Sequence, residues 1–417
     1  KQVTEVMVEE GRHALALLSA ARFDHPAKKL VMIGVTGTKG KTTTTHMIRA
    51  ILLAAGKKVG MIGTTGTVIG DVVTPTLNTT PESYELHQAF AQMVEAGCEY
   101  AVMEVSSQGI KMHRTDGLYF NYAIFTNISP DHIGPGEHAD FEEYLYYKTR
   151  LLNMCGIGLV NKDDKHAPQI IKAANCELYT YSEESKEADF VASDIRYVSQ
   201  PDFVGTEFHI SGKYDMEVRL GIPGLFNVVN ALAAVSVCSF LGLDQARISH
   251  ALENIRVNGR MEIVYTSERC TVLVDYAHNA VSMESLLSTL RDYKPKRLVC
   301  VFGCGGNRSK DRRYSMGEIG GKMADLSIIT ADNSRYEKVE DIIADIRGSI
   351  EKTGGKFIEI PDRREAIRYS ILHAQPGDMV AVIGKGHEDY QEINGVRHHF
   401  LDREVIEETV KELGEKA

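Results

Sequence analysis

The feature that most restricts the fold of this chain is a glycine-rich loop between an apolar run and a helix-forming stretch. Residues 34–42 read Gly-Val-Thr-Gly-Thr-Lys-Gly-Lys-Thr. The preceding residues, Lys29–Ile33, predict a short buried strand, and Thr43–Ala55 predict a helix. Glycines let backbone N–H groups face an anion, and the start of the helix adds positive potential. The segment therefore predicts a phosphate-binding loop.

The side chains of this loop suit a nucleotide bound together with magnesium. Lys41 is placed to reach the terminal phosphates, and the hydroxyl of Thr42 is placed to bind Mg²⁺. The spacing departs from the general pattern of four residues between glycine and Gly-Lys, because Gly37 lies three positions before Gly40. A plain glycine turn before a helix is the alternative interpretation. The agreement of strand, loop, Gly-Lys-Thr and helix argues against it.

Strands and helices alternate along the first half of the chain. Tyr100–Val105 and Tyr122–Asn127 are two of the apolar runs that predict strands, and the alternation predicts an α/β fold with a mostly parallel, doubly wound sheet. Residues 186–222 differ. Phe203–Ile210 and Tyr214–Leu220 alternate between apolar and polar residues on either side of a Ser-Gly-Lys turn, which predicts a small antiparallel hairpin packed beside the main sheet.

A second domain is expected from about residue 257, where the pattern of strand and helix begins again. Thr271–Val274 and Arg297–Phe302 predict strands, and Ser282–Tyr293 predicts the helix between them. These elements indicate a second, Rossmann-like α/β domain. Near the start of the chain, residues 4–22 predict a helix. A length of 417 residues allows two or three domains with large buried cores.

Composition excludes some classes of partner. The formal net charge of −10 argues against nucleic acid or an anionic membrane surface, because both attract basic proteins. No apolar run reaches the roughly 18 residues of a membrane span. The seven cysteines are scattered without a Cys-x-x-Cys pair, which predicts reduced thiols and a cytoplasmic location. Cys300 and Cys304 resemble half a metal site, but no second pair accompanies them.

Polar residues follow two of the predicted strands. Glu104 ends the first, and Asn127, Asp131 and His132 follow the second. In open α/β sheets ligands bind beyond the carboxyl ends of the strands, and carboxylates there suit Mg²⁺ held with nucleotide phosphates. Beside a phosphate-binding loop, Glu104 and His132 are candidate metal ligands. Lys148 lies in a later helical stretch, and from the residues alone it is no better a candidate than other lysines nearby.

Several separate motifs together resemble one family, the Mur ligases, which are the amide-forming ATPases of cell-wall synthesis. The resemblance runs from about residue 12 to the end, and the loop Thr36–Thr44 matches the shortened phosphate loop of that family. The other motifs are Asn78–Pro81, Met103–Ser107, Phe125–Asn127 with Asp131-His132, Asn227–Ala234, Gly259–Glu262, Val274–His278, Phe302–Gly306 and Gly384–Glu388. Within the family, the chain is most similar to the enzymes that add the third residue of the peptide stem.

The resemblance implies roles at the nucleotide site. Lys41, Glu104, His132 and Lys148 would be catalytic, with Thr42, Glu104, His132 and Lys148 holding Mg²⁺. Lys148 falls where the family carries a carbamylated lysine, a carboxylate made from CO₂. The implied cofactors are ATP and Mg²⁺. The residues implied to bind ATP are Gly37, Thr38, Lys39, Gly40, Lys41, Thr42, Thr43, Asn227, Asn230, Arg260 and Asp275.

The resemblance also implies two substrates, UDP-muramoyl-dipeptide and a diamino acid. The acceptor would contact Asn78, Thr79, Thr80 and Ser106, and the amino acid would contact Arg308, Asp332, Asn333, Arg335, Gly384 and Glu388. Two arginines can hold carboxylates and one glutamate can hold an ammonium group, which favours meso-diaminopimelate over lysine. Family members that use diaminopimelate carry Asp-Asn-Pro-Arg where this chain has Asp-Asn-Ser-Arg at 332–335. We expect a monomer.

The sequence departs from the family pattern in places. Lys39 replaces the usual asparagine, Gln108 replaces a frequent histidine, and the segment 134–138 is one residue longer than usual before Lys148. We therefore predict three regions: residues 1–27 as a remnant or truncated form of the UDP-sugar-binding domain, 28–256 as the ATP-binding domain, and 257–417 as the amino-acid-binding domain. The alternatives are use of lysine or another amino acid, a folylpolyglutamate-type ligase, and a P-loop protein that binds nucleotide without catalysis.

Overall fold

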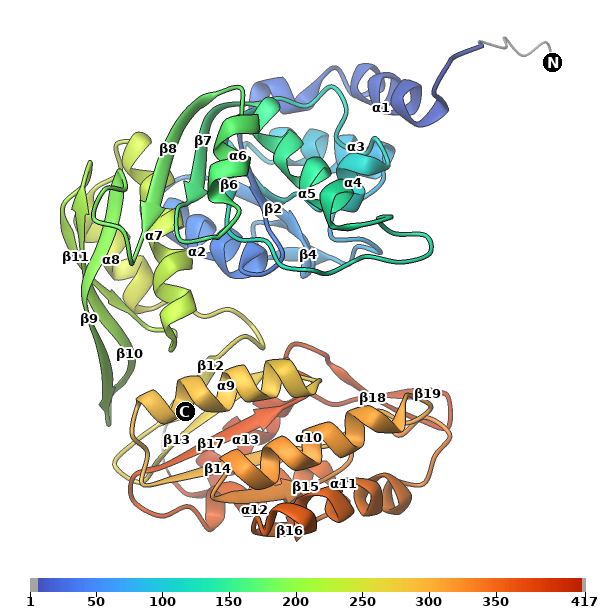
Figure 1. Ribbon diagram of the computed structural model, residues 1–417, viewed down its shortest axis with the longest axis vertical. Coiled ribbons are helices and arrows are strands. Elements are labelled where there is room, and N and C mark those ends of the chain that lie inside the picture. Colours follow the sequence, from blue (N-terminus) through green and yellow to red (C-terminus); the bar gives the residue numbers. More distant parts are fainter. Residues whose placement is uncertain (1–6, 415–417) are drawn as a thin grey trace. The chain divides into compact units, whose positions relative to one another are not determined.

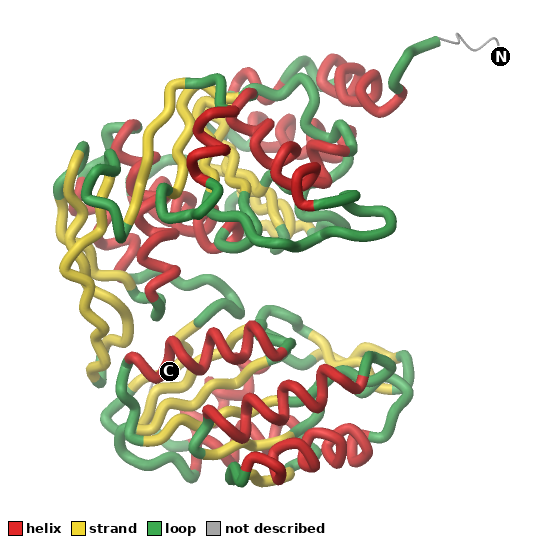
Figure 2. The backbone as a smooth tube through the Cα atoms, in the orientation of Figure 1, coloured by secondary structure: helices red, strands yellow, loops and turns green. Residues whose placement is uncertain are grey.

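The computed structural model describes residues 7–414, which divide into two compact units. The first unit holds residues up to 195 with 208–219 and 226–255, and the second holds 196–207, 220–225 and the chain from 256 onward. Helices and strands alternate through both units (Figure 2). The helix expected at 4–22 is α1 (Gly11–Arg22), and residues 4–6 lie outside the described part of the chain.

The elements before residue 256 alternate between strands and helices for most of their length. After α1 they are η1 (Pro26–Lys29), β1 (Val31–Thr36), α2 (Lys41–Ala54), β2 (Val59–Gly63), β3 (Gly66–Ile69), β4 (Val72–Thr74), α3 (Ser83–Glu95), β5 (Tyr100–Glu104), α4 (Ser107–Lys111), β6 (Phe120–Phe125), α5 (Phe141–Thr149), η2 (Arg150–Asn153), β7 (Cys155–Asn161), α6 (Ala167–Ala173), β8 (Glu177–Ser182), β9 (Phe190–Gln200), β10 (Phe203–Gly212), β11 (Met216–Leu220), α7 (Leu225–Phe240) and α8 (Gln245–Glu253).

Strand β1 lies in the middle of the larger sheet. The strand order is β11-β10-β9-β8-β7-β6-β1-β5-β2-β3-β4, and β1 pairs in parallel with both β5 and β6. Strands β6, β7, β8 and β11 of this sheet are labelled in Figure 1. The carboxyl ends of these three strands therefore meet at one edge. Buried apolar residues of β1, β5, β6, α3 and α5 form one core, which holds that edge in place. The mostly parallel α/β sheet predicted from the sequence is confirmed.

The hairpin predicted from 186–222 differs in one respect from the expectation. Strands β10 and β11 are present, but they extend the main sheet rather than packing beside it. The reason is that β8 pairs with β9 in parallel through Tyr181 and Ser182, so the hydrogen-bonded ladder continues to the edge. Alternation along a hairpin predicts its two strands but does not indicate which other strand they join.

The second unit contains a smaller sheet of six strands in the order β12-β13-β17-β14-β15-β16. Strand β12 is antiparallel to β13, and the other pairs are parallel. The elements from residue 256 are β12 (Glu262–Thr266), β13 (Cys270–Asp275), α9 (Ala280–Asp292), β14 (Arg297–Phe302), α10 (Lys310–Met323), β15 (Leu326–Ile329), α11 (Val339–Thr353), β16 (Phe357–Glu359), α12 (Arg363–Leu372), β17 (Asp378–Ile383), β18 (Tyr390–Ile393), β19 (Val396–His399) and α13 (Asp402–Glu412). A Rossmann-like second α/β fold is thus present, with its own apolar core.

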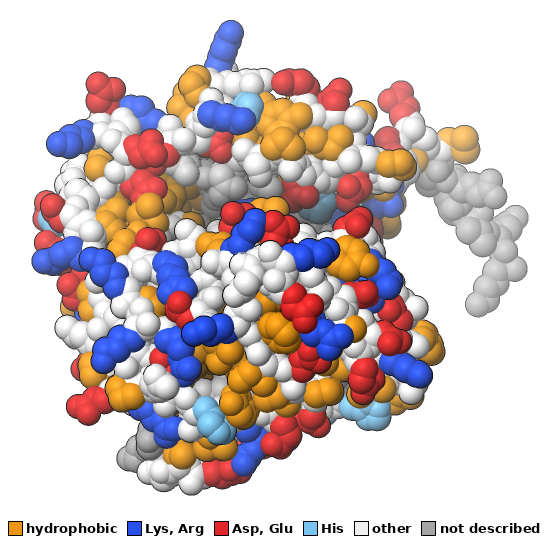
Figure 3. Space-filling view, turned by 60° about the horizontal axis from the view of Figure 1, so that its bottom comes forward, with side chains coloured by type: hydrophobic (Ala, Val, Ile, Leu, Met, Phe, Trp, Pro, Cys, Tyr) orange, Lys and Arg blue, Asp and Glu red, His pale blue; other side chains and the backbone are white. Residues whose placement is uncertain are grey.

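Acidic and basic side chains are intermingled over the face that Figure 3 shows. Within residues 7–414, none of the helices combines the length and the apolar character needed to cross a bilayer.

Candidate active site

The phosphate loop is held in shape by the residues that follow β6. Thr126 Oγ1 donates to Lys39 O at 2.6 Å, and Asn127 Oδ1 accepts from Lys39 N at 2.9 Å. Gly37 has φ +145°, and a Cβ at this position would lie 1.9 Å from Thr126 Oγ1. Gly40 has φ +86° and begins α2. Glycine is therefore required at 37 for both conformation and space, which leaves the loop N–H groups at the start of a helix.

Two lysines reach into this loop. Lys41 Nζ donates to Gly37 O at 2.8 Å, and Lys148 Nζ donates to the same oxygen at 2.8 Å. Lys148 is buried, and its ammonium lies 4.6 Å from the centre of the Tyr144 ring. Burial, with a smaller contribution from the charge of Lys41, holds the pKa of Lys148 well below its usual value. The structure thus distinguishes Lys148 from other lysines, which the residue pattern alone did not.

Glu104 lies at the same edge as a buried carboxylate surrounded by hydroxyl groups. Thr42 Oγ1 donates to Glu104 Oε1 at 2.9 Å, and Thr64 donates to the same carboxylate from its backbone N–H at 2.9 Å. Gly63 keeps the space clear, because a Cβ there would lie 2.3 Å from Glu104 Oε1. Sequence reasoning placed Thr42 and Glu104 together but missed Thr64, which no spacing rule connects to the loop.

His132 lies on the loop between β6 and α5. Its backbone has φ +53°, and its Nδ1 lies 3.0 Å from Glu137 Oε1. The ring is exposed and lies 6.3 Å from the ring of Tyr144, whose hydroxyl is 3.1 Å from Thr38 Oγ1. His132 is therefore held beside the phosphate loop through Tyr144, with a carboxylate at its Nδ1.

The residues expected to contact the acceptor surround Thr80. Thr80 Oγ1 donates to Glu104 O at 3.0 Å and accepts from Ser106 N at 3.0 Å. Thr79 Oγ1 lies 3.1 Å from Thr64 Oγ1, and Asn78 precedes it on the same loop. Arg114 Nη1 donates to Thr80 O at 3.1 Å, which places a cation beside these hydroxyls. Sequence reasoning missed this arginine.

The predicted nucleotide residues of α7 lie against the phosphate loop. Asn230 Nδ2 donates to Asn227 Oδ1 at 3.2 Å, and Thr44 Oγ1 donates to Asn230 Oδ1 at 3.4 Å. In the second unit, Asp275 accepts from Met261 N at 2.8 Å, and the guanidinium of Arg260 lies 5.0 Å from the centre of the Tyr276 ring. Burial raises the pKa of Asp275 although backbone N–H groups and Arg260 oppose it.

The second unit contains a pocket of about 370 Å³, a size typical of small-molecule sites. All six residues predicted to contact the amino acid line it: Arg308, Asp332, Asn333, Arg335, Gly384 and Glu388. Tyr276, His278, Arg312 and Tyr390 also line it, and sequence reasoning missed them. The pocket therefore combines three arginines with two carboxylates, so it presents both signs of charge.

Glu388 is fixed at this pocket by three donors. Asn333 Nδ2 donates to Glu388 Oε2 at 3.0 Å, Lys385 Nζ donates to the same oxygen at 3.2 Å, and Tyr276 OH donates to Oε1 at 3.4 Å. Arg335 has φ +52°, and its Nη1 donates to Gly306 O at 2.9 Å. Both side chains are thus positioned by neighbours rather than left free in solvent.

The fold and the two sites define the class of protein: a P-loop nucleotide-binding enzyme whose second unit contains a pocket lined by side chains of both charges. The Mur ligase middle domain matches residues 35–238, and the Mur ligase glutamate ligase domain matches residues 259–386. The chain belongs to the Mur ligase family, and it is an ATP-dependent ligase.

Individual relatives agree with this assignment. The chain is 40% identical over 416 residues to the UDP-N-acetylmuramoyl-L-alanyl-D-glutamate--2,6-diaminopimelate ligase of Caldanaerobacter subterraneus, covering 98% of this chain and 84% of that one. A solved structure of a ligase of the same name is 32% identical, with a TM-score of 0.76 over 99% of this chain and 86% of the other. A folylpolyglutamate synthase of Thermotoga maritima, at 18% identity and a TM-score of 0.69 over 90% and 91% of the two chains, shares the fold alone.

Proposed function

We propose that this enzyme joins meso-diaminopimelate to UDP-N-acetylmuramoyl-L-alanyl-D-glutamate, with conversion of ATP to ADP and phosphate. The observation that carries the substrate choice is the pocket of the second unit, where Arg308 and Arg335 line the same 370 Å³ as Glu388. A molecule with two amino-acid ends needs cations for its carboxylates and a carboxylate for an ammonium group. Lysine lacks the distal carboxylate. The names of the relatives support the same substrate pair.

The first unit is proposed to activate the acceptor. The γ-phosphate of ATP passes in line to the terminal glutamyl carboxylate, which forms an acyl phosphate and releases ADP. Lys41 and the N–H groups of the loop stabilise the charge on the transferred group. The diamino acid then attacks the acyl carbon as a neutral amine. The amide bond forms, phosphate leaves, and the amine gives up a proton.

A magnesium ion fits the residues at this edge. Glu104 is a buried carboxylate whose contacts are hydroxyl and N–H groups of Thr42 and Thr64, and oxygen ligands of this kind suit Mg²⁺. Thr42, Glu104, His132 and Lys148 are the residues proposed to hold it. When bound, the ion would neutralise phosphate charge during the transfer.

Lys148 is proposed to act as its carbamate. Only a neutral amine adds to CO₂, and the lowered pKa of the buried Lys148 favours that neutral form. The neutral amine nitrogen of Lys148 bonds to the carbon of CO₂ and releases one proton, so a neutral buried amine becomes an anion. Such an anion suits a position beside the phosphate loop only when a metal ion compensates it.

The test measures phosphate release from ATP with UDP-muramoyl-dipeptide, adding meso-diaminopimelate, lysine, ornithine or no amine. We expect release with diaminopimelate alone. Arg335→Gln should lower kcat/KM for diaminopimelate by about 10- to 100-fold, since a charged hydrogen bond contributes about 1.5–3 kcal/mol. Arg347→Gln, which removes a partly exposed ion pair between α11 and β16, is the matched control and should leave kcat/KM unchanged.

Other outcomes would separate the parts of the proposal. Release with lysine at the wild-type level would keep the ligase and overturn the substrate choice. If Arg335→Gln and the wild type have the same kcat/KM for diaminopimelate, Arg335 does not contribute to recognition of this substrate. No release with any amine would count against this acceptor.

A further inference from the structure

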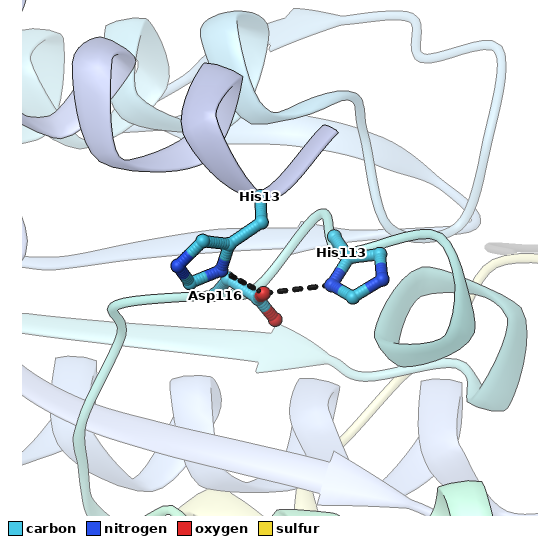
Figure 4. Close-up of side chains that lie close together, drawn as sticks. All are labelled: His13, His113 and Asp116. Carbon is cyan, nitrogen blue, oxygen red and sulfur yellow. Dashed lines mark hydrogen bonds and ion pairs between the residues drawn. The ribbon is translucent and has the colours of Figure 1, made fainter. Parts of the chain in front are cut away.

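Two histidine rings contact the same carboxylate oxygen of Asp116, outside the residues assigned above to the two sites. His13 Nδ1 lies 2.6 Å from Asp116 Oδ2, and His113 Nδ1 lies 2.8 Å from the same oxygen. His13 comes from the first turn of α1, whereas His113 and Asp116 come from the turn after α4 (Figure 4). Within residues 7–414, this is a group of three whose potential ligand atoms all lie within 4.8 Å of one another.

The backbone holds these groups in position. His113 has φ +57°, a left-handed conformation that few residues other than glycine adopt. The turn is fixed on both sides, since Arg12 Nε donates to Met112 O at 2.8 Å and Arg114 N donates to Gly109 O at 2.9 Å. The positions of the two rings are therefore set by rigid segments and not by their mutual contact alone.

The charges around the cluster suit a cation. The guanidinium groups of Arg12 and Arg114 both pair with Glu82, which offsets one of their two positive charges. The carboxylate of Glu10, which accepts from His13 N at 3.2 Å, adds a second negative charge beside the cluster. The side chains of His13, His113 and Asp116 are 50%, 35% and 17% exposed, so an ion has access from solvent.

We propose that His13, His113 and Asp116 form a binding site for a divalent transition metal of the zinc class. Two imidazole nitrogens and one carboxylate oxygen are a ligand set that prefers zinc to magnesium, and solvent supplies the fourth position. Bonds of about 2.0–2.1 Å in a tetrahedron separate ligand atoms by about 3.3 Å. The two histidine–carboxylate contacts, at 2.6 and 2.8 Å, would therefore open by about 0.5–0.7 Å.

The site would join α1 to the body of the first unit. The bound ion replaces two hydrogen bonds with three metal–ligand bonds between segments about one hundred residues apart in the chain. The hydrogen bonds from His13 and His113 to Asp116 join the three ligand side chains to one another and not to Glu104 or the phosphate loop, although Arg114, which follows His113, donates to Thr80 O. The proposed ion is therefore structural, and its loss should change the stability of α1 before it changes phosphate release.

Calorimetric titration of Zn²⁺ into the full chain tests the site. The protein is freed of any affinity tag, treated with EDTA and kept in millimolar Mg²⁺, so that the magnesium site does not take up zinc. We expect one Zn²⁺ per chain, with affinity at least tenfold weaker in His13→Ala, His113→Ala and Asp116→Asn. His209→Ala is the matched control. Its two carboxylate neighbours contact different ring nitrogens, Glu217 at Nδ1 (3.1 Å) and Asp215 at Nε2 (3.5 Å), so the three residues do not surround one point as His13, His113 and Asp116 do.

Two further readouts separate a metal site from a simple hydrogen-bonded cluster. Amide exchange of residues 11–22 should slow by about 100-fold when free Zn²⁺ is 100 times the dissociation constant. Co²⁺ in place of Zn²⁺ should give a visible absorption band that disappears in Asp116→Asn. Asp116→Asn keeps an acceptor oxygen, and its phosphate release should match the wild type, which shows that it is folded. The proposal is overturned if all variants bind Zn²⁺ with the same affinity, or if Zn²⁺ does not change the amide exchange rates of residues 11–22.

Discussion

Removal of Asp402 should destabilise the second unit more than any exposed substitution. Asp402 and Arg363 form an ion pair in which both side chains are fully buried. Arg363 Nε donates to Oδ1 at 2.7 Å and Nη2 donates to Oδ2 at 2.7 Å, so the pair is bidentate. In Asp402→Ala the guanidinium would remain buried without its counter-charge. Breaking a buried pair on one side costs about 3–5 kcal/mol.

The same arginine also ties the pocket together. Arg363 Nη1 donates to Ala331 O at 3.2 Å, and Nη2 donates to Ile383 O at 3.0 Å. These carbonyls directly precede the pocket residues Asp332 and Gly384. The double variant Arg363→Met/Asp402→Leu removes both charges, and such replacements are often neutral or stabilising. We expect the double variant to be about as stable as the wild type. Its KM for diaminopimelate should still be higher than that of the wild type, because the hydrogen bonds from Arg363 to Ala331 O and Ile383 O are lost.

Hydrogen exchange followed by mass spectrometry resolves the second unit from the first. Peptides of β13, β14 and β17 should lose about 3–5 kcal/mol of protection in Asp402→Ala, and the thermal midpoint of this unit should fall by about 6–20 °C. Arg364→Ala/Glu408→Ala is the matched control, because this pair also joins α12 to α13 but is about half exposed. It should change stability by no more than about 1 kcal/mol. Equal effects of the two substitutions would refute the argument from burial.

Three other predictions concern single positions. Gly37→Ala places a Cβ 1.9 Å from Thr126 Oγ1 at φ +145°, so ATP-analogue affinity measured by calorimetry should fall at least tenfold, whereas Gly348→Ala, where a Cβ meets open space, should leave it unchanged. Burial and neighbouring carboxylates raise the pKa of Glu183 from 4.5 to about 7. The free energy of unfolding therefore falls as the pH rises from the unfolded pKa to the folded pKa of this carboxyl. Glu183→Gln should therefore raise the free energy of unfolding, measured by urea titration, by about 1 kcal/mol at pH 8 after allowing for its partial exposure, and by less at pH 5. Lys148→Ala should lose phosphate release and regain part of it with short carboxylic acids, and full activity without any acid would contradict the carbamate role.

The sequence by itself determined the local parts of this protein. The phosphate loop between β1 and α2 was predictable because its glycines, lysine and threonine are contiguous, and because a strand and a helix flank them. The alternation of strands and helices predicted both α/β units, since hydrophobic periodicity is a local property. Six of the residues that line the pocket of the second unit were predicted from the family resemblance, because each lies in a short segment that can be compared by itself. Helix ends were less well predicted: Thr43–Ala55 became Lys41–Ala54, because the loop lets the helix begin directly after Gly40.

Only the tertiary structure decided which distant groups meet. Lys148 was indistinguishable from other lysines until α5 placed its ammonium against Gly37 O, 111 residues away. Thr64 reaches Glu104 because β2 pairs with β5, and the order of strands in a sheet is not written in any one strand. The same holds for the Arg363–Asp402 pair and for His13 with Asp116. Contacts of this kind depend on how all the helices and strands of a unit pack together, and a short segment of sequence does not determine that packing.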